Sequence, residues 1–478
     1  MVIIATLLTL VASVDVEAPT FFAANDELRA YLLEAAENDT GLKARHSEWK
    51  ATLERVPQVT SLDDPMFMYT QFVQSDNKRF AVSLEQKFPW FGTLRAKGDK
   101  ALAEADAALA RFYAARNGVF AAVKEAYFEY ALLGESIRIV ESQVGLLADT
   151  EAVIRSRYAL GLGAESDVYR IQIEQEKTGD QLKGLNQSRS ALAARLNETL
   201  GRQSSEEPPW PQPAQFPPPP PPAPIVLAQI RAQNPDLAAM RHMIEGWEEA
   251  TRVAKKMGYP EFSVGVEYGD MKTVSTSPPL AVPAADPLGQ LNELIADSPE
   301  QPRDDVMISL KLSLPIWRGK VKAGIREAQH MQEAAADDKR RAELALDSAA
   351  HKLLFQIEDA LRRYHLYRDT LAPKQKQTYV SLQAAYETGD YMNTATGFID
   401  VMDSVRALLE FQLEQARAAR DVQVACAELE MLMGRPWTSQ FVKPRQTVNE
   451  TQPSTPAGKD PAVRTVESQT PPPTETKP

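Results

Sequence analysis

The sequence has little of the chemistry that most enzymes and metalloproteins use. One cysteine, Cys426, and five histidines are spread over 478 residues, so a disulfide within the chain is impossible and no two histidines have the spacing of a metal site. No nucleophile–base pair and no glycine-rich phosphate loop is visible. We therefore predict that the protein is not an enzyme and that it holds neither a cofactor nor a metal.

An excess of basic charge is also missing. The 53 lysines and arginines are outnumbered by 65 acidic residues, which gives a net charge of -12. A surface that follows a phosphate backbone needs clustered lysine and arginine. This balance argues against a nucleic-acid partner.

Long apolar runs are absent, apart from a short one at the start of the chain. The run from Val2 to Ser13 is 12 residues long, whereas a membrane-spanning helix needs about 20. Its length fits the apolar part of a secretory signal, which we place at residues 1–18, although the basic residues that usually precede such a run are missing. A buried N-terminal segment is the alternative.

Proline does not occur between Gly92 and Glu207, and this stretch carries a sustained seven-residue apolar repeat. The repeat predicts one helix from about Leu94 to Tyr158, which at 1.5 Å per residue is roughly 100 Å long and supercoils left-handedly against partners. The repeat consists of Ala105, Phe112, Val119, Ala126, Leu133, Val140, Leu147 and Ile154, with a second column at Leu102, Leu109, Val123, Tyr130, Ile137 and Val144. A protein built on such a helix is tubular or fibrous.

Ahead of the long helix in each half of the chain, the apolar period changes to two, which is typical of β-strands. The alternating segments are Met66 to Val73, Phe80 to Phe88, Phe262 to Tyr268 and Ile308 to Leu314, with a turn at 75–78 and a long loop at 269–304. Strands of about ten residues can cross a bilayer only as part of a closed barrel. Four strands cannot close alone, but a trimer would supply twelve. A soluble hairpin pair is the alternative.

The two halves repeat one another. Asp167-Val168 recurs as Asp400-Val401, and Gly201-Arg202 recurs as Gly434-Arg435, both 233 positions later. Eleven prolines between Pro208 and Pro224 separate the halves, and they exclude a helix there. We predict a first repeat at residues 25–205, a proline-rich linker at 206–225, a second repeat at 226–437 and a disordered tail at 438–478.

This duplicated unit of short helix, β-hairpin, very long helix, glycine-marked turn and second long helix resembles the TolC-like outer-membrane efflux proteins. The most specific motifs are the segments Lys87 to Gly92, Tyr158 to Val168 and Phe398 to Ser404. The resemblance implies an α+β membrane protein: a homotrimer with a twelve-stranded outer-membrane β-barrel that continues into a periplasmic α-helical barrel. It further implies the exit duct of a tripartite efflux pump, with a periplasmic adaptor and an inner-membrane pump as partners.

The resemblance also implies site residues. It places Asp400 and Asp403 at the constricted periplasmic end of the tunnel, where three copies would form acidic rings that favour cations. Ser166, Asp167 and Tyr386 occupy positions whose hydrogen bonds hold that end closed. Gly161 and Leu162, and Gly389 in the second repeat, would contact the adaptor.

One departure from the family pattern and one competing class stand beside this interpretation. The second turn carries about five extra residues near 390–394, and the basic residue usual in that turn has no evident counterpart. A coiled-coil scaffold without transport activity would explain the heptads alone; extraction in detergent rather than in buffer separates it from an export duct.

Overall fold

The computed structural model describes residues 26–73, 78–202, 206–211, 216–271, 305–388 and 397–435, all within one structural unit that ends at Ser439. The expected signal, most of the long loop, Gly389, the inserted residues near 390–394 and the tail at 438–478 lie outside the described residues.

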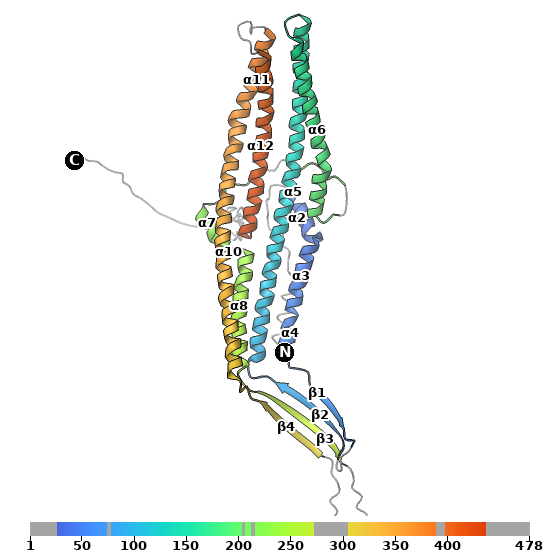
Figure 1. The fold of residues 1–478 in the computed structure, drawn as a ribbon, viewed down its shortest axis with the longest axis vertical. Coiled ribbons are helices and arrows are strands. Elements are labelled where there is room, and N and C mark those ends of the chain that lie inside the picture. The colour runs from blue at the N-terminus through green and yellow to red at the C-terminus, as the bar shows by residue number, and fades with distance from the viewer. Residues whose placement is uncertain are drawn as a thin grey trace, which may run out of the picture. The chain divides into compact units, whose positions relative to one another are not determined.

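The chain passes through two similar series of elements (Figure 1). The first comprises α2 (Asp26–Asn38), α3 (Thr40–Leu53), α4 (Arg55–Thr60), β1 (Met66–Gln71), β2 (Lys78–Phe88), α5 (Thr93–Ala159) and α6 (Glu165–Thr199). The second comprises α7 (Ala223–Gln233), α8 (Pro235–Lys256), β3 (Glu261–Met271), β4 (Asp305–Ser313), α10 (Arg318–Leu366), the π-helix η1 (Tyr367–Leu371), α11 (Ala372–Thr388) and α12 (Gly397–Met433). The expected order of elements is present in both halves. The short opening helix of each half is broken into separate pieces.

The longest helix, α5, has 67 residues and matches the prediction from the heptad repeat. Most of the heptad residues from Val123 to Ile154 are buried, because α12 and α6 pack along this part of α5. Leu102, at the start of the second heptad column, is instead 41% exposed. The heptad therefore faces partners within the chain over its later part and only partly over its first turns.

The four strands form one antiparallel sheet in the order β1-β2-β3-β4. The pairing brings Phe67, Leu84 and Val266 into register, and Val266 pairs with Ile308 on β4. Since side chains alternate between faces, one face of the sheet is apolar across all four strands. The other face carries polar side chains, including the ion pair between Lys311 and Glu85 at 2.5 Å. The predicted strands are confirmed, although β1 ends at Gln71 and β3 runs on to Met271.

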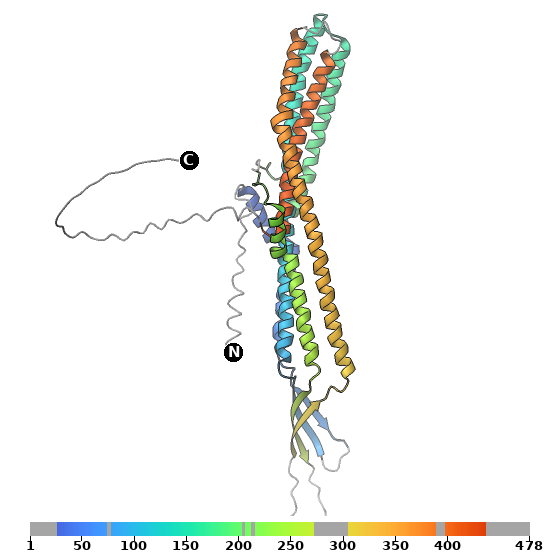
Figure 2. The ribbon, with the colours of Figure 1, turned by 90° about the vertical axis from the view of Figure 1, so that its left-hand side faces the viewer.

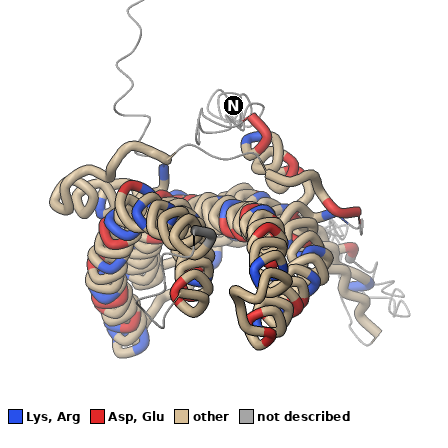
Figure 3. The backbone as a smooth tube through the Cα atoms, turned by 90° about the horizontal axis from the view of Figure 1, so that it is seen from above, with Lys and Arg blue, Asp and Glu red and all other residues tan. Residues whose placement is uncertain are grey.

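The helices pack as neighbours in two successive layers that share α5 and the long helix α10 (Figures 1 and 2). Next to the sheet the neighbours are α3, α5, α8 and α10. Beyond the middle of α5 they are α6, α5, α12 and the later part of α10, which continues through η1 into α11. Acidic and basic residues are interspersed along these helices (Figure 3).

The repeated Gly-Arg motif has the same structural role in both halves. Gly201 and Gly434 end α6 and α12 with φ angles of 68° and 78°. A Cβ atom on Gly201 would lie 2.9 Å from Asn38, where α2 ends, and one on Gly434 would lie 2.7 Å from the Gln233 carbonyl, where α7 ends. Glycine is therefore required at each position for two reasons: the backbone turn is left-handed, and the break in the opening helix lies too close for a Cβ atom.

The proline-rich linker corrects one expectation. Its extended part ends at Pro222, and α7 begins at Ala223 with Pro224 inside its first turn. Proline fits there because the first amides of a helix have no intrahelical acceptor. The linker also packs on the helices. The Trp210 ring stacks on Tyr130 at 4.8 Å between centroids, and the Arg189 guanidinium lies 4.4 Å from the Trp210 centroid.

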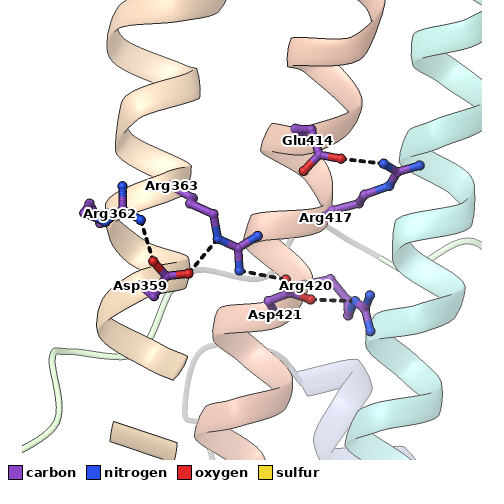
Figure 4. A network of polar contacts seen from close by, with 7 residues as sticks. All are labelled: Asp359, Arg362, Arg363, Glu414, Arg417, Arg420 and Asp421. Carbon is purple, nitrogen blue, oxygen red and sulfur yellow. Dashed lines mark hydrogen bonds and ion pairs between the residues drawn. The ribbon is translucent and has the colours of Figure 1, made fainter. Parts of the chain in front are cut away.

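Polar contacts tie α12 to the other long helices. Between α10 and α12, the guanidinium of Arg363 bridges Asp359 at 2.9 Å and Asp421 at 3.2 Å (Figure 4). Between α5 and α12, Lys124 Nζ lies 2.6 Å from Glu430 Oε2, and both side chains are 1% exposed. Burial raises the pKa of the Glu430 carboxyl and lowers that of the Lys124 ammonium, so each group depends on the other to remain charged.

We expect this buried pair to behave as one unit in a mutant cycle. Lys124→Met or Glu430→Leu alone leaves an uncompensated charge between α5 and α12 and should cost about 3–5 kcal/mol of stability. The double variant should recover most of that loss. Thermal unfolding of the detergent-solubilised protein measures the effect.

The partly exposed pair Lys339–Glu343 serves as a control, and its K339M variant should lose less than about 1 kcal/mol of stability. Additive losses in the double variant would contradict the coupling.

Candidate functional site

The predicted site residues lie at the end of the helical hairpins that is far from the sheet (Figure 1). One hairpin consists of α5 and α6, joined by the turn at 160–164, and the other consists of α11 and α12. The apolar core at this end combines residues of both hairpins, among them Leu147, Ile154, Tyr379 and Val405. Side chains from the two halves of the sequence therefore meet there.

The first turn is closed by Gly161, which has a φ angle of 72°. The Gly161 amide donates to the Tyr158 carbonyl and the Leu162 amide donates to the Arg157 carbonyl, both at 2.9 Å. These are the two bonds with which a glycine cap ends a helix. Leu160 and Leu162 are 71% and 63% exposed on the same turn. Gly161 therefore shapes the turn, and the two leucines are the side chains that it presents.

Asp400 and Asp403 lie in the first two turns of α12, and Asp403 is the more exposed of the two. Asp403 pairs with Arg406 at 3.2 Å. The guanidinium of Arg406 also binds both carboxylate oxygens of Glu174 on α6, at 3.0 and 2.7 Å. The hydrogen bond from Arg406 lowers the pKa of Glu174. This three-residue group carries a net negative charge and fastens α12 to α6.

Tyr386 is buried at the end of α11 and contacts a basic residue of the other hairpin. The Arg157 guanidinium lies 4.6 Å from the Tyr386 ring centroid and also donates to the Tyr386 carbonyl. Burial, together with the nearby charge of Asp167, raises the pKa of the Tyr386 hydroxyl. Ser166 is exposed in the first turn of α6. The structure thus brings Tyr386 close to Asp167 and Arg157, whereas Ser166 has a separate, exposed place.

Two further polar contacts join the hairpins beside these residues. The Gln143 amide donates to the Val405 carbonyl at 3.0 Å, and the hydroxyls of Thr150 and Tyr379 are 3.2 Å apart. Gln143 and Thr150 lie on α5 and their partners lie on α12 and α11. Neither contact has a local sequence signal, because the partners are more than 200 positions apart.

Within the described ranges, no cluster of histidine, cysteine and carboxylate side chains could hold a metal ion. No helix in the same ranges has the length and apolar content that a membrane span needs. Cys426 is a free, buried thiol within α12.

Comparisons with known proteins agree with this architecture. The family model described as Outer membrane efflux protein matches residues 69–202 and 226–435. The pyoverdine export outer membrane protein OpmQ of Pseudomonas putida is 21% identical over 366 residues, which cover 74% of this chain and 70% of that protein. The crystal structure of CusC aligns with a TM-score of 0.69 at 15% identity, over 87% of this chain and 94% of that one. The open state of the Neisseria gonorrhoeae MtrE outer membrane channel aligns with a TM-score of 0.66 at 16% identity, over 86% and 90% of the two chains.

The fold is that of the outer-membrane channels named above. The chain belongs to the outer membrane efflux protein family. It is therefore an outer-membrane transport protein with an extension into the periplasm.

We predict that Glu174→Gln loosens the start of α12. Loss of the paired charge should cost about 0.5–1 kcal/mol and speed amide hydrogen exchange in the first turns of α12 two- to fivefold. Because the pKa of Glu174 is lowered, its contribution should be fully present at neutral pH and vanish as the pH falls through that lowered pKa. The exposed Glu176, two positions along α6, supplies the control E176Q. Equal exchange rates in both variants would show that the pair does not hold α12.

Proposed function

We propose that the chain is one third of a homotrimeric exit duct of a tripartite efflux pump. Three sheets would close into a twelve-stranded barrel in the outer membrane, and three sets of helices would form a tunnel through the periplasm. The duct is passive and carries small molecules or ions that a periplasmic adaptor and an inner-membrane pump deliver to it. Residues 1–18 serve as the secretory signal, and residues 25–205 and 226–437 are the two efflux repeats.

The sheet is the observation that carries this proposal. Among the described residues, β1 pairs only with β2 and β4 pairs only with β3, so both outer strands have a free edge. In lipid, each unpaired backbone N–H or C=O group costs roughly several kcal/mol of free energy. Since β1 and β4 run antiparallel to each other, β4 of one subunit can pair with β1 of the next and keep the strands alternating around a closed ring.

The sides of the helical layer support the same assembly. Exposed apolar side chains recur along α10 and α11 in steps of about three to four turns. They are Leu344, Phe355, Leu366 and Val380. On the opposite side of the protomer, Tyr169 and Ile173 form an exposed pair on α6. Neighbouring subunits would cover both surfaces, because the layer has α6 at one side and α10 and α11 at the other.

The gate is proposed at the hairpin tips. Three copies of Asp400 and Asp403 would form acidic rings, which repel one another and select cations at close range. Tyr386 with Asp167, and Ser166 beside them, would belong to the contacts that keep the tip closed. Gly161, Leu162 and Gly389 would lie where the adaptor docks, and the exposed leucines of the first turn fit an apolar partner.

A lysine substituted on either face of β4 tests the assembly. Leu310 lies on the apolar face, and Leu310→Lys should prevent the formation of a heat-labile trimer in detergent, since a lipid-facing lysine costs about 2–4 kcal/mol per subunit near the middle of the bilayer. Met307 pairs with Glu267 on the polar face. The control variant Met307→Lys should therefore keep wild-type trimer yield.

The wild-type protein should run as a trimer in a detergent gel and as a monomer after boiling. A stable monomer in buffer without detergent would overturn the barrel. Equal trimer yields for L310K and M307K would overturn the assignment of the lipid-facing side.

The gate is tested in planar bilayers. Replacing Asp400 and Asp403 together with alanine should raise single-channel conductance or weaken cation selectivity and block by multivalent cations, because three copies remove six carboxylates from one constriction. Trimer yield should stay near wild type. The exposed pair Asp337 and Asp338 on α10 supplies the control D337A/D338A. Unchanged conductance, selectivity and block in the tip variant would remove these aspartates from the gate.

A further inference from the structure

Aromatic side chains gather where the strands of the sheet meet the helices. The ring of Phe262, on the apolar face, lies 5.4 Å from that of Phe88 and 6.2 Å from that of Phe91. Trp90 contacts Phe91 and stacks on Tyr259 at 5.3 Å, with the ring planes 11° apart. This aromatic cluster continues the apolar face of the sheet to its helical end. Aromatic rings in such a place mark the interface between lipid tails and headgroups.

Two cations are fixed at the edge of the aromatic cluster. Lys256 Nζ donates to the Phe91 carbonyl at 3.2 Å and lies 5.7 Å from the Tyr259 ring centroid. The Arg318 guanidinium donates to the Gly258 carbonyl at 3.0 Å. These contacts hold both charges beside the rings. Each cation keeps further N–H groups beyond the bond to a carbonyl.

Neither cation is neutralised by a carboxylate among the residues that the structure describes. The acidic position nearest to Lys256 in sequence, Glu261, is paired with Lys87 at 2.6 Å. Lys320 and Lys322 follow Arg318 on the first two turns of α10, where both are exposed and likewise without a carboxylate partner in the described ranges. Elsewhere the long helices carry many ion pairs, including Arg363 with Asp359 and Arg406 with Glu174. Other exposed lysines of the helices, such as Lys374 and Lys376, are also outside these ion pairs, but they do not lie beside the aromatic cluster. The four cations named here are distinguished by their position at the end of the sheet that meets the helices.

Lys256 lies in the last turn of α8, where a cation is favourable for the helix dipole, but helix stability does not explain the three basic residues of α10. The first turn of α10 contains no acidic side chain, and basic side chains there oppose the positive end of the helix dipole. Their cost would be offset by a negative partner outside the chain. The partner has to lie at the level of the aromatic cluster, where a bilayer presents its phosphate groups.

We propose that Lys256, Arg318, Lys320 and Lys322 form a binding site for the phosphate groups of anionic phospholipids in the periplasmic leaflet of the outer membrane. The proposal rests on the proposed function, because it requires the sheet to span that membrane. Lys256 and Arg318 would bind the phosphodiester directly beside the rings. Lys320 and Lys322 would add attraction from the first turns of α10.

The test compares two lipids on the full chain purified in a neutral detergent. Phosphatidylglycerol, which is anionic, should raise the melting temperature of the trimer and remain bound in native mass spectra, whereas phosphatidylcholine should do so much less. The difference should shrink between 50 and 500 mM NaCl, where screening becomes strong. The K256Q/R318Q variant should bind phosphatidylglycerol at least fivefold more weakly.

Matched variants separate this site from general charge effects. K256R/R318K keeps both charges and should bind like the wild type. K374Q/K376Q removes two exposed charges from α11, far along the chain from the sheet, and should also bind like the wild type. Equal effects of the two lipids on the wild type, or unchanged phosphatidylglycerol binding by K256Q/R318Q, would overturn the proposal. If K256Q/R318Q does not assemble, the wild-type comparison decides alone.

Conductance separates the failure of this site from the failure of the duct. A wild-type protein that conducts ions in planar bilayers but does not distinguish the two lipids retains the proposed function and loses the lipid site. A protein that binds phosphatidylglycerol selectively and never conducts retains the lipid site and loses the duct.

Discussion

The backbone hydrogen bonds of the sheet constrain everything else in this protein. Among the described residues, the four-stranded sheet has one apolar face and two free edges, and a membrane provides no water to satisfy them. In the proposed duct, the chain would satisfy them as one segment of a closed ring. That requirement extends into the helices, because β2 leads directly into α5 and β4 leads directly into α10. The helices therefore form a layer with two uncovered sides and not a bundle closed around its own core.

The duplication builds this layer from two copies of the same series of elements. Each half supplies two strands, one continuous or nearly continuous long helix and one returning helix, and each return ends in a glycine that packs against a break in the opening helix. The halves have also diverged where they meet. Glu430 lies four positions before Gly434 and pairs with Lys124, whereas Asn197, four positions before Gly201, donates to the Glu206 carbonyl of the linker. The same site on the repeat thus binds the other half in one copy and the linker in the other.

Periodic patterns made much of the fold predictable from the sequence. The heptad from Ala105 to Ile154 gave the length of α5 within about two residues, because a helix with a buried stripe must repeat that stripe along its length. Strand alternation gave four strands and the face on which each side chain lies. Segment ends were less predictable. Pro224 belongs to α7 because proline is compatible with the first turn of a helix, so a proline run does not by itself mark where a linker stops.

The polar contacts of the site could not be predicted in this way. Arg157 and Tyr386 are 229 positions apart, and Arg406 and Glu174 are 232 apart. Each of these residues looks like an ordinary helical surface residue in its own segment. Only the packing of the two hairpins reveals that Arg157 supplies a basic contact at the tip, although the second turn itself lacks a recognisable one. The family resemblance implied closing contacts for both Tyr386 and Asp167, but it did not identify Arg157 as the cation beside the Tyr386 ring.

The contacts between the two hairpins differ in strength along their length. Near the middle of α5, the tie to α12 is an ion pair that is 1% exposed on both sides, and separating it would leave two charges in an apolar environment. Near the tip, the tie from Arg406 to Glu174 has one partner that is 53% exposed, and water can replace its bonds at small cost. Of these two charged contacts, the one at the middle therefore resists separation more than the one near the tip. The apolar core that includes Leu147, Ile154, Tyr379 and Val405 also holds the hairpins together at the tip. Opening there would have to separate this core, whereas water could replace the bonds of Arg406.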